Sequence, residues 1–260
     1  MTPVGLKTMI KLETFLLQRP GPNHRNPEPM RTLLAFIFTA APLFAREPAK
    51  IAIIGDSTVC EYAPDSPNRG WGQFIAGYFD DSVMVVNLAV GGRSTKTFAA
   101  EGRWAKTLAE KPDLVLIQFG HNDSHAKERP EATDAATDYP ANLCRYIDEA
   151  RAAGATPVLI TPMHRRWFNT DGTLLDNLQP YADAMKTVAR EKHVPVIDLH
   201  TMSGDLYLSL SSAELQALAP APPEQNDKTH FGEQGAMTMA ELIMSRFPDA
   251  VPDWQPRLIP

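Results

Sequence analysis

The segment Ile51-Ala52-Ile53-Ile54-Gly55-Asp56-Ser57-Thr58 decides the fold class of this chain of 260 residues. Its first four residues form an unbroken apolar run, which indicates a strand that is buried on both faces, as in parallel sheets. Gly55 and the polar residues after it indicate a turn at the carboxyl end of that strand. A buried strand that ends in a polar turn is typical of α/β proteins, which bind ligands at that edge of the sheet.

Four further apolar runs, each followed by turn residues, repeat the pattern at 83–88, 113–119, 156–161 and 194–198. Segments with helical spacing lie between or after the runs, at 102–109, 139–153, 176–192 and 232–246. Strands that alternate with helices predict a parallel sheet with helices on both faces. We therefore expect an α/β fold, a three-layer α/β/α sandwich with a five-stranded parallel sheet, followed by an irregular tail over 248–260.

The N-terminal residues are expected to lie outside the folded domain. Residues 30–45 have the basic start, short apolar core and small-residue end of a secretory signal peptide, with cleavage after Ala45. A buried N-terminal helix is the alternative, but Pro42 would break such a helix. Residues 1–29 show no pattern that could bury an apolar face and are interpreted as an upstream extension. Residues 46–260 then form one domain.

The composition of the predicted domain excludes some classes of partner. After residue 45 the chain has 20 basic and 29 acidic residues, a net charge of −9, which argues against nucleic acid. No segment there approaches the roughly 18 consecutive apolar residues that a membrane span needs. Cys60 and Cys144 are the only cysteines, so no disulfide framework holds the fold together. We expect two free thiols, with Cys60 at the start of a helix.

Four polar blocks stand at positions where a parallel sheet would bring them together. Three of them follow the first three strands and one precedes the last helix: Gly55 to Thr58, Asn87 to Ser94, Gly120 to Asp123, and Asp227 to Phe231. The carboxyl ends of parallel strands meet at one edge of the sheet. We therefore expect the four blocks to form one site.

The residue types in these blocks match the requirements of acyl transfer. That reaction needs a nucleophile, a base, a group that orients the base and donors for the developing oxyanion. Ser57 would be the nucleophile, His230 the base and Asp227 the orienting carboxylate. The backbone amides of Ser57 and Gly92 and the side-chain amide of Asn122 would form the oxyanion hole.

These blocks, in this order, resemble those of the SGNH (GDSL-like) hydrolases. The Ser, Gly, Asn and His of that superfamily fall on Ser57, Gly92, Asn122 and His230. The resemblance runs from about residue 50 to 246 and implies a flavodoxin-like SGNH hydrolase fold, with residues 46–260 as the catalytic domain. The G-x-S-x-G elbow of α/β-hydrolases is absent around Ser57, which argues against that fold.

The finer resemblance is to rhamnogalacturonan acetylesterases. They share Gly-Asp-Ser-Thr, Gly-Trp-Gly at 70–72, Gly-Arg-Ser at 92–94 and Gly-His-Asn-Asp at 120–123, and the segment from His164 to Phe168 looks like their bacterial members. This resemblance implies a serine esterase that removes O-acetyl groups from pectic rhamnogalacturonan through an acetyl-serine intermediate, without metal or cofactor. The identity of the substrate rests on the resemblance alone.

Five residues are candidates for binding the sugar chain: Trp71, Arg93, Arg165, Arg166 and Trp167. Arginine can hold a carboxylate with two parallel hydrogen bonds, which suits an acidic sugar. Tryptophan can stack on sugar rings, although aromatic residues mostly fill cores. The alternative for Arg165 and Arg166 is a solvated surface pair.

Several of these residues also allow a purely structural interpretation. Ser57 alone could cap a helix, Asn122 could only hold a turn, and Gly92 could serve turn geometry. His121 and His125 invite a metal interpretation, but no third ligand of suitable spacing accompanies them, so no metal is expected.

Other functions remain open at this point. The alternatives are an SGNH esterase that acts on acetylated xylan, a lysophospholipid or a thioester, and a non-catalytic carbohydrate-binding protein. The expected partner is an acetylated polysaccharide or oligosaccharide, and the expected location is secreted or periplasmic.

Overall fold

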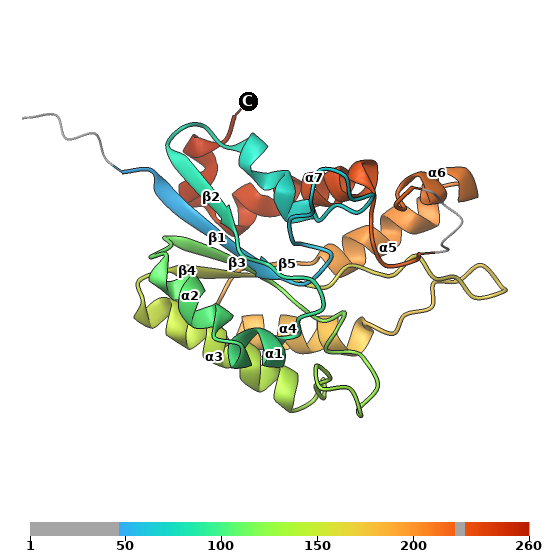
Figure 1. Ribbon diagram of the computed structural model, residues 1–260, viewed down its shortest axis with the longest axis horizontal. Helices are drawn as coiled ribbons and strands as arrows, with labels where there is room; N and C mark the ends of the chain where they lie inside the picture. Colours follow the sequence, from blue (N-terminus) through green and yellow to red (C-terminus); the bar gives the residue numbers. More distant parts are fainter. Residues whose placement is uncertain (1–46, 222–226, 260) are drawn as a thin grey trace, which may run out of the picture. The chain divides into compact units, whose positions relative to one another are not determined.

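The computed structural model describes residues 47–221 and 227–259, so the predicted extension and signal peptide lie outside the described residues (Figure 1). Five parallel strands form one sheet in the order β2-β1-β3-β4-β5, which confirms the expected fold class. The strands are β1 (Ala49–Gly55), β2 (Val83–Asn87), β3 (Leu114–Gln118), β4 (Thr156–Ile160) and β5 (Val196–Ile197).

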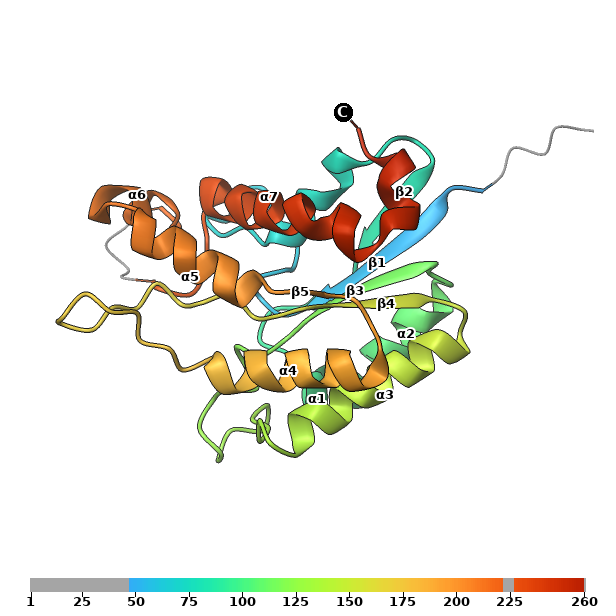
Figure 2. The ribbon, with the colours of Figure 1, turned by 180° about the vertical axis from the view of Figure 1, so that it is seen from behind.

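Helices cover both faces of the sheet, as Figures 1 and 2 show from opposite sides. One layer consists of α1 (Thr95–Ala100), α2 (Arg103–Ala109), α3 (Asp138–Ala152) and α4 (Gln179–Lys192). The other contains the 3₁₀ helices η1 (Trp71–Gln73) and η2 (Ile75–Tyr78), with α5 (Leu199–Ser209) and α7 (Glu233–Ala250). The described part also includes α6 (Ser212–Ala217) and η4 (Pro252–Arg257).

Two apolar cores lie on the two faces of the sheet, and the alternation of side chains along each strand divides the residues between them. Ile51 and Ile53 of β1 belong to the core beneath α7, whereas Ala52 and Ile54 belong to the core beneath α3 and α4. All four are fully buried. A strand that is buried on both faces cannot tolerate polar residues at either set of positions, which explains its unbroken apolar run.

The order of the strands determines where on the sheet a ligand-binding crevice forms. Ile53 of β1 pairs with Asn87 of β2 on one side and with Leu116 of β3 on the other. The chain crosses from β1 to β2 over one face and from β2 to β3 over the opposite face. The loops beyond the carboxyl ends of β1 and β3 therefore diverge, and this reversal point is where such sheets bind ligands.

The tail after α7 differs from the sequence expectation. Helix α7 continues to Ala250 and η4 follows it over Pro252–Arg257, so most of the described tail is helical rather than irregular. The cause is aromatic packing. Phe79 makes edge-to-face contacts with Phe247 and Trp254, at ring-centroid distances of 5.4 and 6.5 Å.

The segment after β1 also differs from expectation, because it turns instead of entering an α-helix. Cys60 lies in this turn, and η1 follows only at Trp71. The predicted helix start at Cys60 is therefore wrong. Cys60 and Cys144 are both unpaired, as expected. In the described part of the chain, no helix is long and apolar enough to cross a membrane.

The buried carboxyl of Asp123 ties the end of β3 to the start of α1. Its Oδ1 atom accepts hydrogen bonds from the Thr95 amide at 3.1 Å, the Thr95 hydroxyl at 2.5 Å and the Thr133 hydroxyl at 2.9 Å. Burial raises the pKa of Asp123 to about 7, and the hydrogen bonds from Thr95 and Thr133 only partly oppose that rise.

The raised pKa of Asp123 predicts a pH-dependent contribution to stability. The unfolded carboxyl loses its proton near pH 3.8 and the folded one near pH 7, so this contribution is complete below pH 3.8 and falls as the pH rises to about 7. The free energy of unfolding of the wild type, measured in urea relative to Asp123→Asn, should decrease over that range and then become constant. A difference that stayed constant from pH 4 to 7 would contradict the raised pKa.

Candidate active site

The turns after β1, β2 and β3 meet the segment before α7 around one pocket, with a volume of about 620 Å³. The pocket brings together most of the predicted site residues and some that were not predicted. Its lining consists of Ser57, Gly91, Gly92, His121, Asn122, Ser124, His125, Ala126, Arg165, Trp167, Asn177, Thr229 and His230. It lies beyond the carboxyl ends of β1 and β3, where the strand order reverses.

Ser57, His230 and Asp227 form a continuous hydrogen-bonded chain. His230 Nε2 lies 2.9 Å from Ser57 Oγ, and His230 Nδ1 lies 2.8 Å from Asp227 Oδ2. With Asp227 ionised, Nδ1 carries the proton and Nε2 is free to accept the serine hydroxyl hydrogen. The geometry is that of a serine nucleophile with a histidine base and an orienting carboxylate.

The Asp227 carboxylate is held on both oxygens. Oδ2 accepts from the imidazole, while Oδ1 accepts from the backbone amides of Thr229 and His230, each at 2.8 Å. Partial burial would raise the pKa of Asp227, but the hydrogen bonds from His230 and Thr229 outweigh burial and hold the pKa below its ordinary value. Asp227 therefore remains an acceptor into the acidic range.

The predicted oxyanion donors line the same pocket as Ser57. Gly92 is exposed and has φ of +77°, a conformation that favours glycine. Asn122 Nδ2 donates to the Arg93 carbonyl at 3.1 Å, which fixes the amide while its second hydrogen remains for a ligand. Gly91 packs against Ser57, where an added Cβ would lie 3.5 Å from the serine Cβ.

Comparison with known proteins agrees with this geometry. Residues 53–237 match the GDSL-like lipase/acylhydrolase family. A rhamnogalacturonan acetylesterase of Bacillus subtilis is 38% identical over 211 residues, which cover 76% of this chain and 89% of the relative. The chain belongs to the GDSL-like (SGNH) hydrolase family, among the rhamnogalacturonan acetylesterases.

Solved structures share the fold of this GDSL-like hydrolase. A Bacillus subtilis protein superposes with a TM-score of 0.67 at 25% identity, over 80% of this chain and 57% of that longer chain. An acetylxylan esterase of Geobacillus stearothermophilus superposes with a TM-score of 0.60 at 21% identity, over 76% of this chain and 94% of the other.

A buried polar chain beneath the nucleophile corrects the expectation for Trp71. Trp71 Nε1 donates to Gln118 Oε1 at 2.6 Å, Gln118 Nε2 donates to Thr58 Oγ1 at 2.9 Å, and Thr58 Oγ1 donates to Asp56 Oδ1 at 2.8 Å. Trp71 is 0% exposed, so the prediction that it stacks on a sugar is wrong. The indole instead supports the turn that carries Ser57.

Asp56 and His121 lie together behind the nucleophile. Asp56 Oδ2 is 3.5 Å from His121 Nδ1, and both side chains are buried. Burial would raise the pKa of Asp56, but His121 and Thr58 outweigh it, so the pKa lies below its ordinary value. Burial lowers the pKa of His121. His121 lines the pocket next to Asn122.

Arg165 and Arg166 are both buried, so they are not the solvated surface pair that was the alternative to substrate binding. Arg165 is 7% exposed, and its guanidinium donates to Asn177 Oδ1 at 2.8 Å and to the His121 carbonyl at 3.0 Å. Arg165 thus forms a wall of the pocket, with its hydrogen bonds directed at protein groups. Arg165 lines the pocket beside Ser57 and His230, so substrate binding by this residue stays a prediction.

Arg166 fastens the segment that carries the base. It is 4% exposed, and its Nη2 atom donates to the carbonyls of Asp227 at 3.0 Å and His230 at 2.6 Å. Its backbone amide also donates to the Lys228 carbonyl at 2.7 Å, and its guanidinium lies 4.6 Å from the Phe231 ring centroid. Arg166 therefore positions the segment that carries His230, and binding of a sugar carboxylate by Arg166 stays a prediction.

The remaining substrate-binding candidates differ in position. Trp167 is 39% exposed and lines the pocket, so sugar stacking by this residue stays a prediction. Arg93 lies outside the pocket lining, and its Nε atom contacts Glu101 Oε2 at 3.1 Å. Asn177 was missed, because it lies in a loop without a motif, and only the folded chain brings it to Arg165.

One group of potential metal ligands occurs among the described residues, namely His164, Asp176 and His200. The two imidazole rings are stacked, with centroids 3.9 Å apart and planes 20° from parallel. Lone pairs of parallel rings do not converge on one ion, whereas metal-bound histidines direct theirs at the metal. His200 instead bonds the Pro162 carbonyl through Nδ1 and Asp176 through Nε2.

The position of Arg166 predicts that its removal lowers kcat on charged and neutral substrates alike. Arg166→Ala removes two charge-assisted hydrogen bonds to the segment that carries His230, so kcat should fall at least about tenfold on both acetylated rhamnogalacturonan and a neutral aryl acetate. Arg103→Ala, at a partly exposed position of α2, serves as control. A rise in KM restricted to the charged polymer, with kcat intact, would contradict the positioning role.

Proposed function

We propose that this protein is a serine acetylesterase that removes O-acetyl groups from rhamnogalacturonan through an acetyl-serine intermediate on Ser57. The observation that carries the proposal is the contact of His230 with both Ser57 Oγ and Asp227 Oδ2, at 2.9 and 2.8 Å. The rhamnogalacturonan acetylesterase relative at 38% identity supports the substrate class.

In the first half of the reaction, His230 Nε2 takes the hydroxyl proton while Ser57 Oγ bonds to the acetyl carbonyl carbon. The carbonyl oxygen becomes an oxyanion, and the donors assigned to it are the amides of Ser57 and Gly92 and the side chain of Asn122. The bond from the acetyl carbon to the sugar oxygen then breaks, and His230 returns its proton to that oxygen. The sugar leaves as a free alcohol.

In the second half, water replaces the sugar. His230 takes a proton from the water as its oxygen bonds to the acetyl carbon, and the bond to Ser57 Oγ breaks as the proton passes to the serine. Acetate leaves and the free hydroxyl is restored. Asp227 stays ionised throughout and stabilises the imidazolium that forms in each half.

Acetylated xylan is the second candidate substrate. The observation that favours it is a relative named acetylxylan esterase, from Xylanibacter ruminicola, which is 25% identical over 222 residues. Acetate release from acetylated rhamnogalacturonan, homogalacturonan and xylan distinguishes the candidates. We expect the highest kcat/KM on acetylated rhamnogalacturonan, and a preference for xylan would overturn this substrate assignment.

The proposed triad predicts the effect of three substitutions. Ser57→Ala and His230→Ala should each reduce kcat on an aryl acetate by at least about 10³-fold, because the triad acts as a unit. Asp227→Asn should lose less than either. Circular dichroism should show a retained fold. If Ser57→Ala kept more than about a tenth of the wild-type turnover, the nucleophile would be misassigned.

We also propose that the protein is exported, since residues 30–45 have the pattern of a signal peptide. Expression in a secreting bacterial host should yield a mature N-terminus at Arg46, within a few residues, by intact-mass measurement. A matched variant that replaces Leu34 with Arg should remain unprocessed, because a charge interrupts the apolar core. An uncleaved wild-type chain would contradict export by this segment.

A further inference from the structure

A second pocket, with a volume of about 330 Å³, lies beside the catalytic one. Two short segments separate the two pockets. Trp167 lines the catalytic pocket while its neighbour Phe168 lines the second, and His230 lines the first while Lys228 lines the second. The second pocket is therefore adjacent to the triad.

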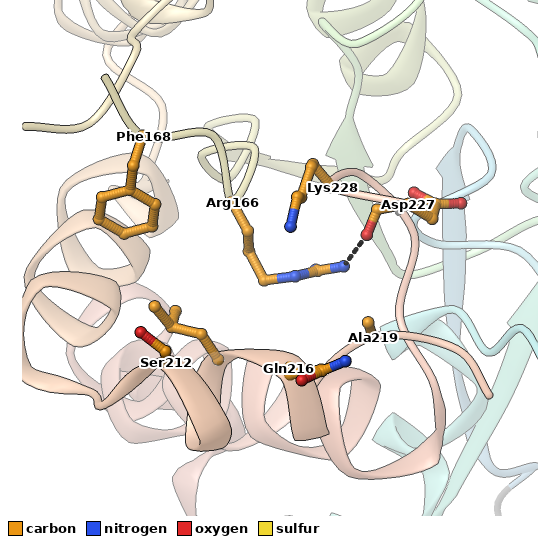
Figure 3. Close-up of a pocket in the computed structure, with 8 residues that line it drawn as sticks. Arg166, Phe168, Ser212, Gln216, Ala219, Asp227 and Lys228 are labelled. Atoms are coloured by element: carbon orange, nitrogen blue, oxygen red, sulfur yellow. Dashed lines mark hydrogen bonds between the residues drawn. The ribbon is translucent and has the colours of Figure 1, made fainter. Parts of the chain in front are cut away.

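The side chains around the second pocket favour an anion. Figure 3 shows Arg166 lying across the pocket, with Lys228 on one side and Gln216 and Ser212 on the other. The only carboxylate among its described lining residues belongs to Asp227. Both Asp227 oxygens already accept hydrogen bonds within the triad segment. The described lining thus offers two cations.

Arg166 retains a donor that its protein contacts do not use. Nη2 bonds two carbonyls, whereas the buried Nη1 has no acceptor in the described part of the chain. Burial lowers the pKa of Arg166, and interactions with Tyr207 and Asp227 oppose that shift only in part, so a nearby anion would stabilise the charge. Arg166 is 4% exposed, so its charge is fixed in place, and Lys228 is the more accessible cation.

The other lining groups suit a sugar rather than a simple ion. Phe168 is 37% exposed and offers an aromatic face. Gln216 and Ser212 offer an amide and a hydroxyl for sugar hydroxyl groups. A pocket of this volume falls within the ordinary range for small ligands.

We propose that this second pocket binds the carboxylate of a uronic acid residue that neighbours the acetylated sugar, with Lys228 as the recognising cation and Arg166 as a fixed charge behind it. This inference rests on the proposed function, because an acetylated sugar in the catalytic pocket places the next residues of the chain near the segment from Asp227 to His230. The local cations offset the repulsion that a net acidic protein exerts on an acidic polymer.

Binding to the inactive enzyme tests the pocket without turnover. The ligand is a rhamnogalacturonan oligosaccharide freed of acetyl groups, titrated by calorimetry into the full chain carrying Ser57→Ala. Adding Lys228→Ala should weaken binding at least about fivefold, and Lys228→Arg should restore most of it. Adding Lys106→Ala, which removes an exposed lysine of α2, should change nothing. Raised salt should weaken binding by the parent more than by the Lys228→Ala variant.

The same oligosaccharide with its carboxylates reduced to alcohols is the matched ligand. It should bind the parent about as weakly as the acidic ligand binds the Lys228→Ala variant. Equal affinity for the acidic and reduced ligands, equal affinity of the Lys228→Ala and Lys106→Ala variants, or no binding by the parent would each overturn the proposal. A parent that binds the acidic ligand through Lys228, while the active enzyme releases no acetate from the polymer, would overturn the proposed function and leave the pocket assignment standing.

Discussion

Parallel pairing between β1 and β3 is the constraint on which the site depends. The two strands are neighbours in the sheet, with Ile53 opposite Leu116, although β2, α1 and α2 lie between them in the sequence. Because the chain leaves β1 over one face and reaches β3 over the other, the loops at their carboxyl ends diverge. The Ser57 and Asn122 turns form the walls of the crevice that results.

Buried polar side chains stabilise this crevice. The chain from Trp71 through Gln118 and Thr58 to Asp56 supports the nucleophile turn from below, and Arg166 fastens the carbonyls of Asp227 and His230. A broken bond within such a network leaves a buried group unpaired, so each member is costly to remove. The sheet determines where the crevice lies, and these hydrogen-bond networks hold its side chains in the fixed geometry that acyl transfer needs.

The sequence allowed the sheet and the grouping of Ser57, Asp227 and His230 to be predicted, because their signals are local. Buried parallel strands are continuous apolar runs, and the polar blocks that carry Ser57, Asn122 and His230 stand at recognisable positions relative to those runs. Whether a charged side chain is buried depends on residues that are distant in the sequence, so no local signal predicts it. Arg165 and Arg166 have the composition of a solvated pair, and Arg166 is buried where the segment from Asp227 to His230 packs against the loop after β4. Trp71 likewise bonds to Gln118, which lies 47 residues further along the chain.

The short helix α6 was not predicted, although Ser211 and Glu214 form a capping box, which is a sequence signature of a helix start.

The order of these parts along the chain bears on biosynthesis. Ser57 and Asn122 are translated long before His230, and helix α7, which follows the histidine, brings Met239, Ile243 and Phe247 to one of the two cores. A nascent or proteolytically shortened chain that stops after β5 holds a serine without its base, on a sheet with one face incompletely covered. The contact between His230 and Ser57 and the part of the core that α7 contributes are therefore both formed by the last third of the chain.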